Sequence, residues 1–378
     1  MKRLVVALVV LMVGWWLAPG AGQASASHVS CGVTVTTDTV LDSDLVDCPN
    51  NGVVIGADDI SLDLGGHVID GDRRPFRECP RRQPCDTGVV NDGHDGVTVS
   101  DGSVREFEVG VVVAQARHAR VLRLSSSNNR FVGIGLFESA RSLVRDSSAT
   151  GSTDRHVGVG MVLFRAHHVQ VVHNAFRHNA HVGIVSPESN HSLMERNVFS
   201  RNDDEAILVE GGNRNQVTRN RFVRNGAGIT LGLGSRNMID HNRISGGRDG
   251  IRVEKGHDNL VAENVVVDAR RVGITLGIRN PFIGGARNFV LGNLVRRSRG
   301  DGFVVLKKDA HSLLSGNIAK AARDDGFDVE SRSATLASNR AVRNGDLGIE
   351  AVFGVLDGGR NNAHGNGNPL QCTNIACS

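Results

Sequence analysis

Histidine and acidic side chains recur in this sequence at near-constant spacing. His156, His181 and Asp204 are separated by 25 and 23 residues, and each lies two residues before a glycine or alanine that opens a short apolar segment. Glu205 and Glu210 belong to the same stretch as Asp204. If equivalent positions stack, imidazole and carboxylate groups form one catalytic row, acting as general base and acid or holding a divalent metal. A polar row of turn residues facing water is the alternative, because turns are rich in Asp, Asn and His.

A second set of charged side chains follows the apolar segments. Glu210 and Glu254 lie two repeats apart with Gly232 between them, which corresponds to about 9–10 Å if each repeat adds one strand spacing. Inverting glycosidases hold their two carboxyl groups about 6.5–9.5 Å apart to admit a water molecule. An ordinary mixed-charge surface is the alternative interpretation. The candidate substrate-binding residues are Arg252, Glu254, Lys255, Asp328 and Glu330.

Histidine is concentrated between residues 156 and 191, where seven of the 15 occur. Alignment of the repeats places His168 under His191, and stacked imidazoles are candidate ligands for copper or zinc. The chain has only five Met and no free-thiol motif, so a soft copper(I) site is poorly supported. Calcium on carboxylates is the other metal to consider, and copper and zinc rank behind it. The sequence identifies no cofactor.

The elements that position these side chains are short strands repeated along the chain. Alternating segments such as VGIGL, AGITL and DGIRV follow a marker glycine, and apolar residues at the first and third positions after it are typical of a strand with one buried face. Asparagine recurs in phase, which predicts an internal ladder of hydrogen-bonded amides. The markers are Gly110, Gly133, Gly158, Gly183, Ala206, Gly228, Gly250, Gly273, Gly302, Gly326 and Gly348. The asparagines are Asn174, Asn197, Asn220, Asn242, Asn264, Asn293, Asn317 and Asn339.

Repeats of 22–25 residues without helical periodicity predict one rung of a coil per repeat. We therefore expect an all-β, single-stranded, right-handed parallel β-helix of about eleven or more rungs, with its main body over residues 94–356. Leucine-rich repeats have a similar period, but these rungs carry Val, Ile and Gly in place of the leucine pattern. Capping rungs are expected over residues 27–72, a disulfide-pinched basic loop over 73–93 and a disulfide-closed cap over 357–378.

The first 26 residues have the pattern of a secretory signal peptide. Lys2 and Arg3 precede an apolar run from Leu4 to Ala18, and the following Ala-Ser-Ala matches a signal-peptidase site. This run is shorter than the roughly 20 residues that span a bilayer, so a membrane anchor is the weaker interpretation. We expect cleavage near Ala26, a secreted, extracellular or cell-envelope location and no membrane span in the mature chain.

Six cysteines lie outside the central repeats. Oxidising compartments favour disulfides over thiol chemistry, so all six are expected to pair. Local pairing is the economical arrangement, although six cysteines allow 15 connectivities. The neighbouring pairs are Cys31 with Cys48, Cys79 with Cys85, and Cys372 with Cys377.

The whole mature chain resembles a known family. It is similar to secreted bacterial right-handed β-helix repeat proteins grouped with the periplasmic copper-binding NosD domain, within the pectate-lyase-like superfamily. The resemblance is carried by the rung pattern and by the segments CGVTVTTDTVLDSDLVDC, VVIGADDISLDLGGHVIDG and GNGNPLQCTNIAC. It implies the fold, whereas the activities of such proteins range from polysaccharide lyases, epimerases and hydrolases to none known.

Two local patterns bear on the activity that the resemblance implies. The segment DGFDVES, residues 325–331, resembles the YGFDPHE motif of mannuronan epimerases, with Asp328 at the catalytic aspartate. Asp325 replaces the tyrosine of that motif and Glu330 replaces its histidine, so the match fails at two catalytic positions. Pectate lyases use an arginine base with calcium on carboxylates, a role that the resemblance assigns to Arg248 or Arg252.

Composition narrows the classes of function. The formal net charge is only +3, so we do not expect a nucleic-acid binder, which needs a basic face. We expect a monomer whose partner is a polysaccharide or a cell-envelope glycan. Three hypotheses remain: a secreted protein that binds and processes an acidic polysaccharide by lyase, hydrolase or epimerase chemistry, a noncatalytic glycan-binding or cell-envelope solenoid, and a NosD-like metal-handling protein.

Overall fold

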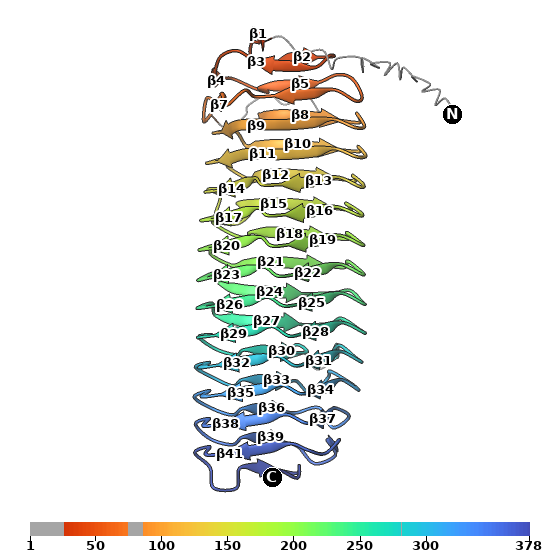
Figure 1. Ribbon diagram of the computed structural model, residues 1–378, viewed down its shortest axis with the longest axis vertical. Coiled ribbons are helices and arrows are strands. Elements are labelled where there is room, and N and C mark those ends of the chain that lie inside the picture. The colour runs from red at the N-terminus through yellow and green to blue at the C-terminus, as the bar shows by residue number, and fades with distance from the viewer. Residues whose placement is uncertain (1–25, 75–85, 281) are drawn as a thin grey trace, which may run out of the picture.

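A computed structural model describes residues 26–74, 86–280 and 282–378 of the 378-residue chain. These residues form a long rod of stacked strands and contain no helix (Figure 1). The expected signal peptide lies outside the described residues except for Ala26, and so do Cys79 and Cys85. No helix in the described part of the chain is long and apolar enough to cross a membrane.

Three faces of the rod are built from parallel strands. The first face is a sheet of 15 strands: β2 (Val33–Val35), β5 (Val53–Ile55), β8 (Thr87–Asp92), β10 (Val109–Ala114), β12 (Val132–Phe137), β15 (Val159–Phe164), β18 (Ile184–Pro187), β21 (Glu205–Glu210), β24 (Ala227–Leu231), β27 (Asp249–Val253), β30 (Ile274–Leu276), β33 (Phe303–Val305), β36 (Phe327–Val329), β39 (Ile349–Ala351) and β42 (Cys372–Thr373).

The second and third faces are joined as one sheet of 27 strands, because β9 (Thr98–Arg105) and β11 (Arg120–Ser127) run through both. The second face also contains β1 (Ala26–Ser27), β3 (Thr39–Leu41), β6 (Ser61–Asp63), β13 (Leu143–Arg145), β16 (Gln170–Val172), β19 (Leu193–Glu195), β22 (Gln216–Thr218), β25 (Met238–Asp240), β28 (Leu260–Ala262), β31 (Phe289–Leu291), β34 (Leu313–Ser315), β37 (Thr335–Ala337) and β40 (Leu356–Asp357). The third face also contains β4 (Leu45–Cys48), β7 (Val68–Gly71), β14 (Ser148–Thr150), β17 (Ala175–Arg177), β20 (Val198–Ser200), β23 (Arg221–Val223), β26 (Arg243–Ser245), β29 (Val265–Val267), β32 (Leu294–Arg296), β35 (Ile318–Lys320), β38 (Arg340–Val342) and β41 (Asn362–His364). The predicted right-handed parallel β-helix is confirmed.

One apolar core fills the interior of the rod. On the first face, the first and third residues after each marker point inward, and Ile207, Val209 and Ile229 have no exposed surface. The third face stacks phenylalanine rings, with Phe199 lying 5.1 Å from the ring of Phe176 and 4.9 Å from that of Phe222. Burial of each such side chain contributes about 1.5–3 kcal/mol. The predicted period-two pattern therefore describes the core correctly.

Buried asparagines line three corners of the coil. At the second corner, between the second and third faces, Asn242 donates to Asn264 Oδ1 at 3.0 Å and to the carbonyl of Val217 at 2.7 Å. The eight predicted asparagines form this ladder, which continues to Asn361. Each residue before these asparagines lies in the left-handed region, for example His241 with φ of 53°. Similar ladders at the first and third corners contain Asn215, Asn237, Asn259 and Asn288, and Asn179, Asn202 and Asn225.

The register corrects one predicted marker. Strand β12 pairs with β15 so that Val132 faces Val159 and Ile134 faces Met161. The glycine equivalent to Gly133 is therefore Gly160, not Gly158. The turn between β14 and β15 is two residues longer than the repeat predicts. The residues before Gly158 therefore do not occupy positions equivalent to those before the other markers.

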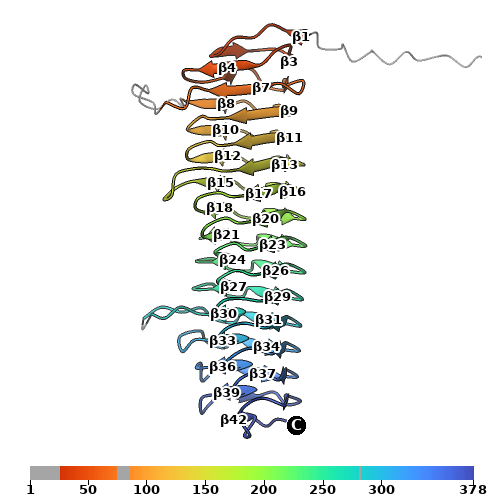
Figure 2. The same ribbon diagram turned by 90° about the vertical axis from the view of Figure 1, so that its left-hand side faces the viewer.

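The ends and one loop complete the rod. Cys31 pairs with Cys48 and Cys372 with Cys377, as predicted. The insertion in the long interval forms a loop after β30, which projects outward on the side of the first face (Figure 2).

Candidate functional site

Charged side chains gather on the first face in two clusters. The Arg252 cluster lies on β21, on β27 and directly after it, and in the turns before β18, β21 and β27. It comprises His181, Asp204, Glu205, Arg248, Asp249, Arg252 and Glu254. The aspartate cluster comprises Asp301, Asp324, Asp325, Asp328, Glu330 and Glu350, on or next to β33, β36 and β39. Both clusters arise because polar residues replace apolar ones at outward strand positions and at the turns that open the strands.

Arg252 is the centre of the first cluster. Its Nη2 atom donates to Glu205 Oε1 at 2.7 Å, its Nε atom donates to Thr230 Oγ1 at 3.3 Å, and Glu254 Oε1 lies 3.7 Å from Nη2. Glu205 is only 7% exposed, and burial together with the neighbouring Asp204 raises its pKa, while Arg252 opposes that shift. The structure thus brings together three of the predicted residues, Glu205, Arg252 and Glu254, in one ion-paired group.

Only part of the predicted histidine row exists. His181 Nε2 lies 3.7 Å from Asp204 Oδ2, and Asp204 Oδ1 lies 3.5 Å from Arg248 Nη2. The backbone N–H of His181 donates to the carbonyl of Gly158, so the position under His181 is a glycine. His156 is in the longer turn, exposed, with its N–H bonded to Asp154. The expected alignment of His156 with His181 and Asp204 is therefore wrong.

Glu210 and Lys255 occupy the outer ends of their strands. Val209 pairs with Leu231 and Leu231 with Val253, so Glu210 and Glu254 stand two rungs apart, as the spacing predicts. Glu210 is exposed and Lys255 is half-buried, and neither forms an ion pair with another described residue. Glu254, in contrast, faces Arg252. This arrangement does not direct Glu210 and Glu254 at a common point.

His168 and His191 stack as the alignment predicts. Their ring centroids are 4.8 Å apart and their planes differ by 12°. The lone pair of an imidazole nitrogen lies in the ring plane, so two parallel stacked rings do not aim at one metal ion. Arg214 Nη1 lies 3.4 Å from His191 Nε2, which adds a positive charge beside the pair. The geometry favours a stacked surface ladder over a chelating site.

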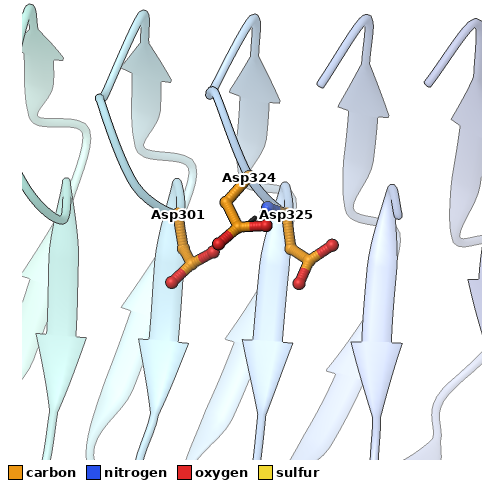
Figure 3. Close-up of side chains that lie close together, drawn as sticks. All are labelled: Asp301, Asp324 and Asp325. Carbon is orange, nitrogen blue, oxygen red and sulfur yellow. Dashed lines mark hydrogen bonds between the residues drawn. The ribbon is translucent and has the colours of Figure 1, made fainter. Parts of the chain in front are cut away.

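Carboxyl oxygens of Asp301, Asp324 and Asp325 lie within 4.8 Å of one another (Figure 3). Asp301 Oδ1 accepts the backbone N–H of Asp325 at 3.1 Å, and Asp325 Oδ1 accepts that of Leu347 at 2.7 Å. Asp325 is only 5% exposed. The turn before each strand thus fixes these carboxyl groups through backbone hydrogen bonds between neighbouring rungs.

Burial and crowding change the acidity of this cluster. Burial raises the pKa of Asp325 to about 8, with Glu350 and Asp301 adding to the shift and the N–H of Leu347 opposing it. Burial also raises the pKa of Asp328 to about 7, with the charges of Asp301, Glu330 and Glu350 adding. In the register, Asp328 stands directly beside Glu350 on the next strand. The cluster therefore offers protonated and ionised carboxyl groups side by side near neutral pH.

Four members of the cluster, Asp301, Asp324, Asp325 and Glu350, were not singled out as site residues by the sequence analysis. Asp249, Asp301 and Asp325 each precede a marker glycine, in the segments DGIRV, DGFVV and DGFDV. This recurrence was the available signal, because residues before the marker occupy equivalent positions in neighbouring rungs. Asp328 and Glu330 were both predicted, and Arg279 Nη2 lies 3.9 Å from Glu330 Oε1.

Two family models match the sequence of this chain. Residues 87–231 and 160–283 match the family model of the right handed beta helix region, and together they span more than half of the chain. The chain belongs to the right-handed β-helix family. Residues 226–366 of this β-helix protein also match the model of the periplasmic copper-binding protein (NosD), so the resemblance stated from the sequence is confirmed. No curated protein in the comparison matches the chain significantly.

Solved structures share the fold of this β-helix protein at low sequence identity. A double mutant of the periplasmic alginate epimerase AlgG has a TM-score of 0.52 and 12% identity, covering 93% of this chain and 79% of the epimerase. PfbA, a surface adhesin of Streptococcus pneumoniae, has a TM-score of 0.49 and 9% identity over 82% of each chain. A DFA-IIIase from Arthrobacter chlorophenolicus A6 has a TM-score of 0.41 and 15% identity, over 70% and 66%. Such identities show the fold alone.

The ligand types in this β-helix protein fit a hard cation better than copper. The segment that matches the NosD model contains no Cys and only one Met, Met238, and soft copper(I) selects thiolate and thioether ligands. The carboxyl oxygens of Asp301, Asp324 and Asp325 are the donors that calcium prefers. These three residues would hold such an ion, which would supply positive charge at this position on the first face.

Proposed function

We propose that this β-helix protein binds an acidic polysaccharide and hydrolyses it with the carboxyl groups of the aspartate cluster. The observation that carries the proposal is the pair Asp328 and Glu350. They are register partners on β36 and β39, and the pKa of Asp328 is raised to about 7. A carboxyl group with such a pKa is about half protonated at pH 7 and suits general acid catalysis.

The spacing of the pair suggests the course of the reaction. Neighbouring strands are about 4.8 Å apart, close to the separation of about 5–5.5 Å in retaining glycosidases. In that chemistry Asp328 donates its proton to the glycosidic oxygen while the Glu350 carboxylate attacks the anomeric carbon and the bond to the leaving sugar breaks. Water then hydrolyses the glycosyl ester, and Asp328 takes the proton of that water. We therefore expect retention of anomeric configuration.

Neighbouring residues supply binding groups for a sugar chain. Arg279 is exposed and its Nη2 atom lies 3.9 Å from Glu330 Oε1, so this cation is available to a sugar carboxylate at the edge of the cluster. The same loop carries Phe282, which is 89% exposed, and Phe353 after β39 is 82% exposed. Exposed aromatic side chains of this kind are typical of binding surfaces.

The Arg252 cluster supports a second location for the same function. Glu205 has a raised pKa and lies beside Arg252, which suits a sugar carboxylate. In the structure, however, Arg252 is already engaged by Glu205 and Glu254, whereas the aspartate cluster has no comparable internal cation. The aspartate cluster is therefore the preferred centre.

We also infer an extracytoplasmic location and a monomeric rod. The two described disulfides support the location, because cytosolic proteins rarely keep them. Cleavage of a signal peptide near Ala26 remains a prediction, to be read from the N-terminus of the exported protein. The metal-handling hypothesis is the weakest of the three, since the NosD-matching segment contains no Cys and Met238 is its single Met.

A polysaccharide screen tests the proposal. Alginate, polygalacturonate and hyaluronate are incubated with the protein, with and without calcium, and reducing ends and unsaturated uronate are measured. We expect reducing ends without unsaturated products, and a loss of activity of at least 100-fold in Asp328→Asn. Asp203→Asn, a change at an exposed aspartate outside both clusters, is the matched control and should retain full activity.

Three results would contradict the proposal. Loss of activity in Glu205→Gln with full activity in Asp328→Asn would move the centre to the Arg252 cluster. Unsaturated products would replace hydrolysis by lyase chemistry. Retention of the polymers without any product, equal in all variants, would identify a noncatalytic glycan-binding solenoid.

A further inference from the structure

A groove lined by arginine runs along the third face and its corner with the first. One hollow in it is lined by Arg177, Arg201, Arg221 and Arg224, together with His178. The next hollow shares Arg224 and adds Arg270, Arg297, Arg299 and Arg323. We refer to these two hollows as the arginine groove. It follows β17, β20, β23, β26, β29, β32 and β35, which lie one above another along one edge of the rod (Figure 1), a length of about 30 Å at one strand spacing per rung.

Three of these arginines form a vertical row. The backbone N–H of Arg299 donates to the carbonyl of Ala269, which is the residue before Arg270. In the same way, the backbone N–H of Arg323 donates to the carbonyl of Ser298, which is the residue before Arg299. Arg270, Arg299 and Arg323 are therefore equivalent positions on consecutive rungs. All three side chains are exposed. Like charges about 4.8 Å apart repel one another, so this row is unfavourable unless an anion covers it.

The groove contains little negative charge of its own. Asp268 is the single carboxylate that lines the two hollows, and Arg297 holds it with hydrogen bonds of 2.7 and 3.0 Å. Among the described residues, Arg177, Arg201, Arg270, Arg299 and Arg323 form no ion pair with a carboxylate. Some exposed arginines elsewhere on the rod are paired, for example Arg287 with Asp258 at 2.7 Å, whereas others, such as Arg141, Arg236 and Arg360, form no ion pair with a described residue. The groove thus concentrates unpaired cations.

We propose that the arginine groove binds an anionic polysaccharide chain lying along the rod. The inference deepens the proposed function, on which it rests for the class of polymer, by giving the substrate a binding surface away from the aspartate cluster. A uronan carries one carboxylate per sugar ring, and a ring is about as long as one rung of about 4.8 Å. Guanidinium groups bind carboxylates through two parallel hydrogen bonds, so successive sugars meet successive arginines.

The lining residues favour a polysaccharide over a nucleic acid. Proteins that bind single-stranded nucleic acids combine a basic groove with aromatic side chains on which the bases stack. Neither hollow is lined by an aromatic ring other than the imidazole of His178. Duplex DNA carries one charge per about 1.7 Å, a density to which one arginine per rung is poorly matched. The partner that fits is a polymer with sparse charges and no bases.

Affinity measurements on the full chain test the proposal. The triple variant Arg270→Gln, Arg299→Gln, Arg323→Gln is compared with the natural protein for binding to alginate oligomers by calorimetry at 20–200 mM NaCl. We expect the Kd to rise at least tenfold at low salt and the dependence of log Kd on log salt to become shallower. The control variant Arg141→Gln, Arg236→Gln, Arg360→Gln removes the same charge from exposed arginines outside the groove and should change the Kd less than twofold.

The outcomes separate this inference from the proposed hydrolysis. Equal affinity of the groove variant and the natural protein would overturn the inference, and so would equal weakening by both triple variants. Duplex or single-stranded DNA binding more tightly than alginate would replace the polysaccharide by a nucleic acid. Groove-dependent binding without any product would leave the inference intact and refute the proposed hydrolysis.

Discussion

Asp309 is a buried acid at the first corner, and its side chain has no exposed surface. It accepts a hydrogen bond from Asn288 Nδ2 at 3.2 Å and another from the hydroxyl of Ser312. Burial raises the pKa of Asp309 to about 6, although these hydrogen bonds oppose the shift. The native state therefore retains a proton at this carboxyl group that the unfolded chain loses near pH 4.

This proton predicts a dependence of stability on pH. Because the pKa is higher in the folded state, the stabilisation is present below pH 4 and is lost as the pH rises through 6. At 1.4 kcal/mol per pKa unit the change is about 3 kcal/mol. We expect Asp309→Asn to flatten the pH dependence of the melting temperature between pH 4 and pH 7, measured by circular dichroism. A natural protein that is more stable at pH 7 than at pH 4.5 by an amount that Asp309→Asn abolishes would contradict the assignment.

At the same scale, the sequence identified most of the charged residues of the two clusters and misplaced one residue, His156. Glu205 and Arg252 were recognised because a fixed spacing from the markers places them on one face, and Asp328 was recognised through the resemblance of DGFDVES to an epimerase motif. His156 was misplaced because the segment VGVGM offers two glycines in alternating positions, Gly158 and Gly160. Only the strand pairing shows which of them continues the row. The ion pair between Glu205 and Arg252 joins side chains that are two rungs apart. The spacing of the repeats does not show which side chains meet in this way.

At the scale of the element, the asparagine ladders hold neighbouring rungs together. Asn242 accepts the backbone N–H and a side-chain N–H of Asn220, at 2.9 and 3.1 Å, and donates to Val217 and Asn264. It is 1% exposed. An amide at this position therefore satisfies backbone groups that the tight corner leaves without partners.

Removal of this amide should be costly. We expect Asn242→Ala to lower the free energy of unfolding by about 3 kcal/mol or more, because it leaves a buried N–H and a buried carbonyl without hydrogen bonds. Urea unfolding followed by circular dichroism measures the change. Asn50→Ala, at an exposed position, should cost less than about 0.5 kcal/mol. Similar losses in the two variants would argue against a special role of the ladder.

The sequence predicted one ladder, and the structure contains three. The ladder at the second corner is continuous from Asn174 to Asn361 and is therefore visible as a repeat. The other two are interrupted, since Ser298 and Ala322 take the amide position at the third corner and Ser189 and Ser192 precede Asn215 at the first. Serine hydroxyls and backbone atoms replace the amides there, so periodicity in residue type disappears while the hydrogen bonding continues.

At the scale of the whole molecule, each rung contacts mainly its two neighbours, through parallel strand pairing along the whole rod. Stability in such a solenoid is a sum of local terms, so a change at one end should remain at that end. The disulfide between Cys372 and Cys377 closes a short loop beside β42, which pairs with β39. A bond that closes so short a loop contributes about 2 kcal/mol.

We expect the double variant Cys372→Ser, Cys377→Ser to unfold locally. Amide exchange in β39 and β42 should become about 30-fold faster, as the loss of about 2 kcal/mol predicts. Exchange in β24, near the middle of the rod, should not change. Hydrogen exchange with mass spectrometry distinguishes this result from a uniform acceleration along the rod, which would show that the coil unfolds as one cooperative unit.

The overall fold was fully predictable, but the distribution of charge was not. Sequence repeats that each correspond to one rung, together with alternating apolar residues, suffice to predict a parallel coil. The net charge of +3 conceals an acidic cluster on the first face and the arginine groove on the third. Sequence reasoning used the near-neutral total as an argument about partners, and the total carries no information about which face each charge occupies.

The asparagine ladders also give the rod an electrical direction. Each amide donates to the amide of the following rung, so the side-chain dipoles are aligned, with their positive ends toward the C-terminus. Two ladders end on a carboxylate at that end, Asn361 donating to Asp357 and Asn288 to Asp309. A negative charge at the positive end of aligned dipoles is favourable, as at the N-terminus of a helix. The coil is thus polar along its axis, and an anion terminates two of its three rows of dipoles.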